Sequence, residues 1–252
     1  GITDHGNMHG AYEMWSTAVK EGVKPIIGIE AYVTPETARQ DQTRVSWDTN
    51  WNPDIDPQHR RRNPNDVSGG GLITHLTMWA ETDEGLVNLM KASTDANLEG
   101  RVMRYPRMDK EILAKYSKGI IASSGCPSGI IQTRLLLGQF DEALRAAGEL
   151  QDIFGRDNFY IEFMDHGLKI EKQVTDGLLD IAKKLNAPLL ATNDSHYVRA
   201  EDAGSQDAML CINSGSTLDE PGRFKFDGTG YYLKSAEEMR ELFKDIPEAC
   251  DN

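Results

Sequence analysis

Short apolar segments of strand type alternate along the chain with longer segments in which apolar residues recur at helical spacing. The strand-type segments lie at residues 2–3, 25–29, 72–80, 119–124, 158–164 and 189–191. Helical spacing predicts helices at about residues 8–21, 84–96, 109–115, 128–137, 140–154, 171–185, 201–211 and 235–243. Strands that alternate with helices are typical of parallel βαβ units. The pattern therefore predicts an α/β fold whose sheet is either open or closed into a barrel.

Residues 34–71 interrupt this alternation. The segment is polar, contains four prolines and ends in the run Ser68-Gly69-Gly70-Gly71. Such a composition favours a loop over a packed element, so we expect a long inserted loop that is partly disordered. Its basic run, His59-Arg60-Arg61-Arg62, could contact nucleic acid, but a solvated loop is the simpler interpretation.

Composition narrows the class of protein. With 252 residues and 39% hydrophobic residues, the chain can bury an ordinary globular core. It contains no apolar run near the roughly 20 residues of a membrane span and no secretory pattern at its start. Three widely spaced cysteines argue against a disulfide framework and favour the reducing cytoplasm. The formal net charge of −13 argues against binding nucleic acid through the overall surface, although bound cations can reverse the sign locally.

Both ends of the chain suggest a segment of a longer protein. The opening residues Gly1-Ile2-Thr3 have the character of the end of a strand, so we expect at least one more strand upstream of Gly1. The closing residues 246–252 contain no obvious signal for the end of a folded domain. We therefore expect residues 1–252 to be a fragment of a larger polypeptide.

Residues that can bind metal recur at or near the predicted strands. They are His5, Glu30, His75, Cys126, His166, Asp194 and His196. Asp194 and His196 follow a buried strand two positions apart, so in an extended backbone their side chains reach into the same space. Active sites gather at the carboxyl ends of strands in parallel sheets and barrels. Imidazoles, a thiolate and carboxylates suit zinc or a mixed transition-metal cluster, and their number exceeds the needs of one tetrahedral ion. The set therefore predicts a multinuclear site of a kind suited to hydrolysis.

Each of these residues also has an ordinary structural explanation. His75 within a strand is typical of a core histidine, Cys126 of a small buried residue, and Glu30 of an ion-pair partner. His9 and His59 are interpreted as structural or solvent-facing. The metal hypothesis therefore depends on the shared position of the residues in the fold rather than on any single motif.

Six short motifs, taken in order, resemble the polymerase and histidinol phosphatase (PHP) domain. They are Thr3-Asp4-His5-Gly6-Asn7-Met8, Gly28-Ile29-Glu30, His75-Leu76, Ser124-Gly125-Cys126-Pro127, Asp165-His166-Gly167 and Asn193-Asp194-Ser195-His196-Tyr197. The form that they resemble stands at the start of bacterial DNA polymerase III alpha subunits. Residues 223–227 and 231–235 resemble the exit of that domain toward the polymerase body. On this resemblance, residues 1–252 form a PHP-domain fragment, with an insert at 34–71 and an exit segment at 222–252.

The resemblance implies a distorted (β/α)7 barrel with a three-metal site at the strand ends. The implied metal ligands are His5, Glu30, His75, Cys126, Asp194 and His196. Of these, His5, Asp194 and His196 are also implied in catalysis. Asp4 and Asn193 are implied to orient the ligands, while His166 either contacts a substrate phosphate or orients ligands as well. Zinc is the expected metal, with two to three ions in the complete site, and manganese or iron are the alternatives.

One motif of the family has no counterpart in the sequence. This is the His-x-His of the first strand, together with the acidic ligand that follows it. By its place in the family, it would lie upstream of Gly1, so we expect the first strand of the barrel to be missing. The fragment would then bind fewer metal ions and could lack activity of its own.

For function, the resemblance implies metal-dependent phosphodiester hydrolysis by a 3′→5′ exonuclease that proofreads new DNA within a DNA polymerase. The implied partners are the single-stranded 3′ end of a primer, the remaining polymerase domains, and the sliding clamp or other replisome subunits. The expected location is the cytoplasm, without contact to a membrane. Two other functions stay open: a structural or accessory-subunit docking domain whose metals stabilise the fold, and a small-molecule phosphoesterase. The exit sequence toward a polymerase body counts against the phosphoesterase.

Overall fold

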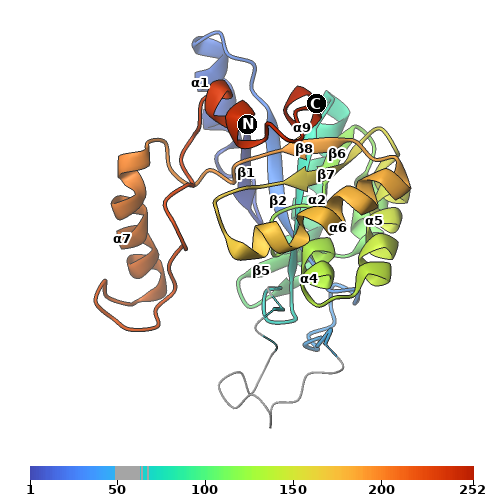
Figure 1. Cartoon of the computed structure of the whole chain (residues 1–252). Coiled ribbons are helices and arrows are strands. Elements are labelled where there is room, and N and C mark those ends of the chain that lie inside the picture. The colour runs from blue at the N-terminus through green and yellow to red at the C-terminus, as the bar shows by residue number, and fades with distance from the viewer. Residues whose placement is uncertain (49–62, 64, 67) are drawn as a thin grey trace.

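A computed structural model describes residues 1–48, 63, 65, 66 and 68–252 (Figure 1). The basic run at 59–62 lies outside these residues. The strands are β1 (Ile2–His5), β2 (Ile27–Val33), β3 (Thr74–Ala80), β4 (Arg101–Val102), β5 (Tyr105–Met108), β6 (Ile120–Ser123), β7 (Phe159–Phe163) and β8 (Leu189–Ala191). The helices are α1 (Ala11–Lys20), α2 (Asp83–Glu99), α3 (Lys110–Tyr116), α4 (Ile130–Leu136), α5 (Phe140–Phe154), α6 (Lys169–Leu185), α7 (Ala203–Ser214), α8 (Ala236–Leu242) and α9 (Glu248–Asp251). A short 3-10 helix, Ala200–Asp202, precedes α7.

The strands form one mixed sheet. Its order is β4-β5-β2-β3-β6-β7-β8, and β1 also pairs with β2 in parallel. β6, β7 and β8 run parallel to one another, as predicted. However, β3 runs antiparallel to both β2 and β6, so the prediction of parallel strands throughout is wrong for β3. The described part of the segment between β2 and β3 contains no crossover helix, which is the usual connection between parallel neighbours.

The hairpin of β4 and β5 was not expected from the sequence pattern. Arg101 and Val102 pair antiparallel with Pro106 and Tyr105. The later residues of β5 then pair in parallel with the last residues of β2. A strand of two residues is too short to show a period of two. The hairpin turn places Met103 at a φ of 53°, in the left-handed region. The result is a short projection beside the end of β2.

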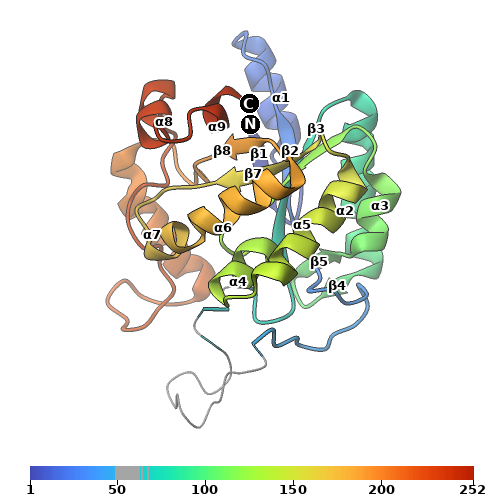
Figure 2. The ribbon, with the colours of Figure 1, turned by 45° about the vertical axis from the view of Figure 1, so that its right-hand side comes forward.

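Helices cover the sheet and bury its apolar residues. Helices α2, α3, α5 and α6 pack against the sheet, as Figure 2 shows. The core contains Ile29, Leu89, Ile120, Phe159, Ile161 and Ile181. Sheet and helices together give the predicted α/β fold, which is barrel-like. In the part of the chain that is described, no strand pairing joins β8 to β1, so the sheet stays open there.

The described start of the expected insert is attached to the sheet. Arg107 of β5 is fully buried and donates hydrogen bonds to the backbone carbonyls of Arg39, Asp41 and Leu72. The Arg39 guanidinium forms an ion pair with Asp109 at 2.9 Å. These bonds fix residues 39–41 beside the sheet, which the composition alone did not indicate.

The residues after β8 include α7, which stands apart from the sheet, and α9, which packs against β8. Helix α7 lies away from α4, α5 and α6 in Figure 1. The chain returns toward β8 through a bridge between Tyr197 and Tyr232. All three cysteines are free thiols, as predicted. Among the described residues, no helix combines the length and apolar character that crossing a bilayer requires.

Candidate metal centre

Four of the predicted ligands come together at one edge of the sheet. His5 ends β1 and is the direct neighbour of Glu30 on β2 in the parallel pairing. Cys126 lies in the loop after β6. His75 stands at the start of β3, and it reaches this edge because β3 runs antiparallel to its neighbours. The reversed strand, which the sequence analysis did not predict, therefore brings His75 to the site.

Glu30 is the centre of this group. The residue is 5% exposed, and its carboxylate contacts two imidazoles, at 2.7 Å from Nδ1 of His5 and 2.9 Å from Nδ1 of His75. The Cys126 sulfur lies 3.3 Å from the same His75 nitrogen. Donor atoms of Glu30, His75 and Cys126 all lie within 4.8 Å of one another. These three residues offer an oxygen, a nitrogen and a sulfur to one point in space.

Asp194 and His196 border the same group from the loop after β8. The ring of His196 lies 5.6 Å from the ring of His5, centroid to centroid. The Asp194 carboxylate lies 3.8 Å from Nδ1 of His196, while that nitrogen is 2.7 Å from the Asp194 backbone carbonyl. The backbone of Asp194 is left-handed, with φ of 43°. The extended geometry expected for this pair is therefore wrong, and a turn rather than a strand presents the two side chains.

The electrostatics of the group suit a cation. Although burial alone would raise it, the hydrogen bonds from His5 and His75 hold the pKa of Glu30 below its usual range. Hydrogen bonding to Glu30 raises the pKa of His5. Burial raises the pKa of the Cys126 thiol well above its usual value, and the carboxylates of Glu30 and Asp194 add to this effect. Protons thus compensate the negative charge here, and a divalent cation would do the same. A donor set of carboxylate, imidazole and thiolate fits zinc and related transition metals.

Glu162 is a buried carboxyl at this site that the sequence analysis did not select. It is 2% exposed and accepts hydrogen bonds from the hydroxyls of Ser123 and Thr192 and from the backbone N–H of Gly125. Through Gly125 it holds the loop that carries Cys126. Burial raises the pKa of Glu162 to about 7. A glutamate that alternates with Phe159, Ile161 and Phe163 has the pattern of a solvent-facing residue, so only the folded structure shows that it is buried.

The raised pKa of Glu162 predicts a pH-dependent stability. The folded state holds the Glu162 proton more tightly than the unfolded state, so this contribution is complete below the unfolded pKa and is lost as pH rises through about 7. We expect metal-free wild type to lose about 2–3 kcal/mol of unfolding free energy relative to Glu162→Gln between pH 5 and pH 8. Denaturant unfolding in chelator measures this difference, with the exposed Glu241→Gln as control. Equal pH profiles for wild type and Glu162→Gln would contradict it.

His166 lies beneath the ligand group rather than in it. Its side chain is 1% exposed, and its Nδ1 lies 2.6 Å from the carboxylate of Glu171. Its Nε2 lies 2.8 Å from the backbone carbonyl of Asn193, and its ring stacks on Tyr231 with centroids 4.0 Å apart. Because both ring nitrogens have partners, this geometry favours the orienting role over the contact with a substrate phosphate. His166 then fixes the backbone just before Asp194.

The two residues expected to orient ligands bond mainly to backbone. The Asn193 amide donates to the carbonyls of Gly230 and Tyr232, which ties the Asp194 loop to the exit segment. Asp4 accepts a hydrogen bond from the backbone N–H of Gly10 at 2.7 Å and so closes the loop before α1. Both residues therefore fix backbone segments next to predicted ligands, and direct contact with a ligand side chain stays a prediction.

Comparison with known proteins places the chain in a family. The family model described as "PHP domain" matches residues 1–166. Over its whole length the chain is 52% identical to the DNA polymerase III subunit alpha of Mycobacterium tuberculosis and 54% identical to that of Saccharopolyspora erythraea. It is 37% identical to the subunit of Borreliella burgdorferi. The chain spans 20–21% of the length of these relatives. The family model covers more than half of the chain, which shows that the chain belongs to the PHP domain family.

Proposed function

We propose that this chain is the PHP domain of a DNA polymerase III alpha subunit and that it hydrolyses phosphodiester bonds at the 3′ end of single-stranded DNA. Such a 3′→5′ exonuclease would proofread new DNA during replication. The observation that carries the proposal is the convergence of Glu30, His75 and Cys126, with His5 beside them. The chain that holds them matches alpha subunits over the whole length of the chain.

Zinc is the metal that the donor set favours, with two to three ions in the complete site and manganese or iron as alternatives. When bound, divalent ions neutralise the charge that develops on a phosphoryl group and make water a better nucleophile. Glu30, His75 and Cys126 would hold one ion, and His5, Asp194 and His196 are the remaining ligand types at the same edge. Glu30 also fixes the rings of His5 and His75, so both present defined nitrogen atoms to the site.

The negative net charge of the chain fits a polymerase in which hydrolysis and duplex binding belong to different domains. With a net charge of −13, this domain would contribute the hydrolytic centre while other polymerase domains hold the duplex. The proposed partners are therefore a frayed primer 3′ end, the remaining domains of the subunit, and the sliding clamp or other replisome proteins. The proposed location is the cytoplasm.

Hydrolysis of a 5′-labelled single-stranded oligonucleotide by the full-length protein tests this proposal. We expect stepwise shortening from the 3′ end that stops in EDTA and returns with added Zn²⁺ or Mn²⁺. Turnover of p-nitrophenyl phosphate without DNA degradation would instead support a small-molecule phosphoesterase. Absence of both activities from the metal-loaded protein would overturn the proposal.

A docking role is the second candidate, and one surface favours it. Tyr12, Trp15 and Val19 lie on α1 with exposed fractions of 76%, 48% and 54%. Their spacing of three and four residues places them on one face of the helix. An exposed apolar stripe of this kind suits contact with another protein domain. In this case chelation would lower the melting temperature without removing any nuclease activity.

A further inference from the structure

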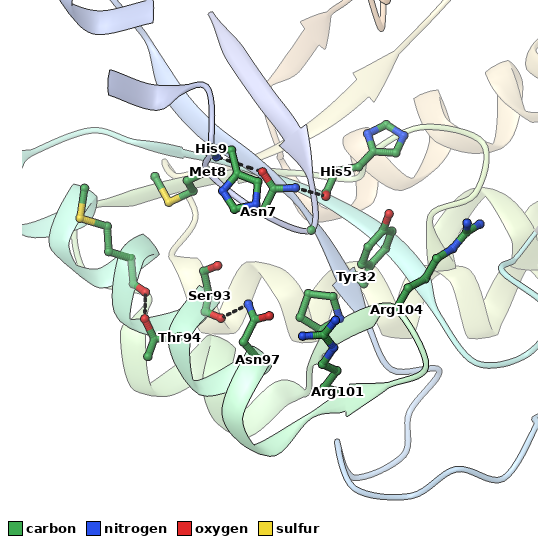
Figure 3. Close-up of a pocket in the computed structure, with 13 residues that line it drawn as sticks. His5, Asn7, Met8, His9, Tyr32, Ser93, Thr94, Asn97, Arg101 and Arg104 are labelled. Carbon is green, nitrogen blue, oxygen red and sulfur yellow. Dashed lines mark hydrogen bonds between the residues drawn. The ribbon is translucent and has the colours of Figure 1, made fainter. Parts of the chain in front are cut away.

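A cavity of about 610 Å³ lies directly beside the metal centre (Figure 3). Three elements form its walls: the loop between β1 and α1, one face of α2, and the β4–β5 hairpin. His5 belongs both to this cavity and to the metal centre, where it contacts Glu30. The volume lies within the roughly 300–1,000 Å³ typical of ligand sites. A ligand in the cavity would therefore lie next to one residue of the candidate metal centre.

The charge of the cavity is opposite to that of the chain as a whole. Its polar and basic lining residues are His5, Asn7, His9, Ser93, Thr94, Asn97, Arg101 and Arg104, and none of the described lining residues is acidic. The chain nevertheless has a net charge of −13. Within the described part of the structure, neither Arg101 nor Arg104 forms an ion pair. Arg101 bonds there only to the Met103 carbonyl of its own hairpin, and Arg104 bonds only to the hydroxyl of the adjacent Tyr105. Two exposed guanidinium groups are thus available to an anion, and guanidinium groups bind phosphate oxygens well.

Aromatic rings connect these arginines with the metal centre. The Arg104 guanidinium lies 5.3 Å from the centre of the Tyr105 ring. Tyr105 meets Tyr32 edge to face with centroids 5.1 Å apart, and Tyr32 lies 5.5 Å from the ring of His75. Tyr32 also lines the cavity. Basic groups beside aromatic rings are the combination by which proteins hold single-stranded nucleic acid, because phosphates pair with the charges and bases stack on the rings.

We infer that this cavity binds the single-stranded DNA backbone next to the bond that is cut at the metal centre. Arg101 and Arg104 contact phosphates, and Tyr32 offers its ring to a base. These are positioning residues, since they act by placing the strand rather than on the reacting atoms. The inference rests on the proposed exonuclease function, but the binding itself can be measured without hydrolysis.

Photo-crosslinking tests the binding in the full-length protein. A single-stranded oligonucleotide with 5-iodo-2′-deoxyuridine near its 3′ end is irradiated with the Asp194→Asn variant, in which the DNA stays intact, and crosslinked peptides are mapped. We expect crosslinks to the peptide that contains Tyr32. Adding Arg101→Ala and Arg104→Ala should reduce them about tenfold, because each exposed charge contact contributes modestly. Arg156→Ala is the matched control: it removes an exposed arginine before the start of β7, outside the cavity.

Kinetics provide the second measurement. In the otherwise wild-type protein, the double arginine variant should raise KM for the oligonucleotide about tenfold with kcat within about twofold. The slope of log(kcat/KM) against log salt should become shallower by about 1.4, because two phosphate contacts are lost. Thymidine 5′-(p-nitrophenyl phosphate), which holds a single phosphodiester, should show an unchanged KM.

The two measurements separate the inference from the proposed function. If the crosslink depends on the arginines but no hydrolysis occurs, the binding site stands and the exonuclease does not. If hydrolysis occurs and depends on Asp194 while crosslinks and salt slope ignore the arginines, the exonuclease stands and the binding site is refuted. Crosslinks that depend equally on Arg156 also overturn the inference.

Discussion

Replacing Asp194 with asparagine is expected to reduce 3′→5′ hydrolysis of single-stranded DNA by at least about 10³-fold, or about 4 kcal/mol of transition-state stabilisation. The carboxylate lies 3.8 Å from Nδ1 of His196, and it contributes to the raised pKa of both His5 and Cys126. Burial raises the pKa of Asp194 itself, so its charge is costly without a nearby cation. An amide of the same shape removes the charge that would hold a metal ion. The measurement is the rate of shortening of a labelled oligonucleotide by the full-length protein.

The backbone conformation at Asp194 also suits asparagine, so the substitution should remove the charge without disturbing the fold. The residue is left-handed, with φ of 43°, and asparagine adopts this conformation more readily than most residues. The variant should therefore keep its melting temperature and any primer extension by the polymerase domains. Asp176→Asn, at an exposed position on α6, is the matched control and should retain hydrolysis. Undiminished degradation by Asp194→Asn would mean that the nuclease activity arises elsewhere.

The strand pattern predicted that His5 and Glu30 lie close together, and the parallel pairing of β1 with β2 explains why they do. His5 ends β1, whereas Glu30 lies in the middle of β2 rather than at its end as predicted, and the register places the two residues side by side. His75 is different, because it begins its strand. It joins the group only through the antiparallel course of β3, and strand direction is a property of the connection rather than of the strand's own residues.

Other features could not be predicted because burial depends on the whole fold. Glu162 has the alternation of a surface residue, yet it points into the barrel-like interior and holds the loop before Cys126. The arginines of the β4–β5 hairpin lie in a segment with no detectable period. Their position beside His5 depends on the pairing of β5 with the end of β2, which is a contact distant in sequence. Short motifs therefore predicted residues that meet in the candidate metal centre, while the neighbouring residues that affect their pKa values and the adjacent cavity became apparent only from the structure.

Replacing Glu30 with glutamine is expected to weaken metal binding by roughly 10³-fold, because it removes the one carboxylate that joins His5, His75 and the Cys126 sulfur. At a metal concentration about 1,000 times the wild-type dissociation constant, binding stabilises the wild type by about 4 kcal/mol. The same concentration would stabilise Glu30→Gln by less than about 0.5 kcal/mol. Metal-dependent shifts in the unfolding midpoint measure this difference directly.

Metal uptake by the wild type should also release protons, since burial and the Glu30 carboxylate keep the Cys126 thiol protonated in the metal-free protein.

The metal-free Glu30→Gln protein provides the internal control for this prediction. Glutamine can still accept a hydrogen bond from one imidazole and donate to the other, so the stability without metal should change much less than the stability with metal. The exposed substitution Glu241→Gln should leave both values unchanged, since that side chain is 76% exposed and forms a surface ion pair with Lys244. If Glu30→Gln instead lost the same stability with and without metal, Glu30 would be a structural link between two histidines. The ion would then have to be held by other residues of the strand ends, and the ligand group centred on Glu30 would be the wrong site.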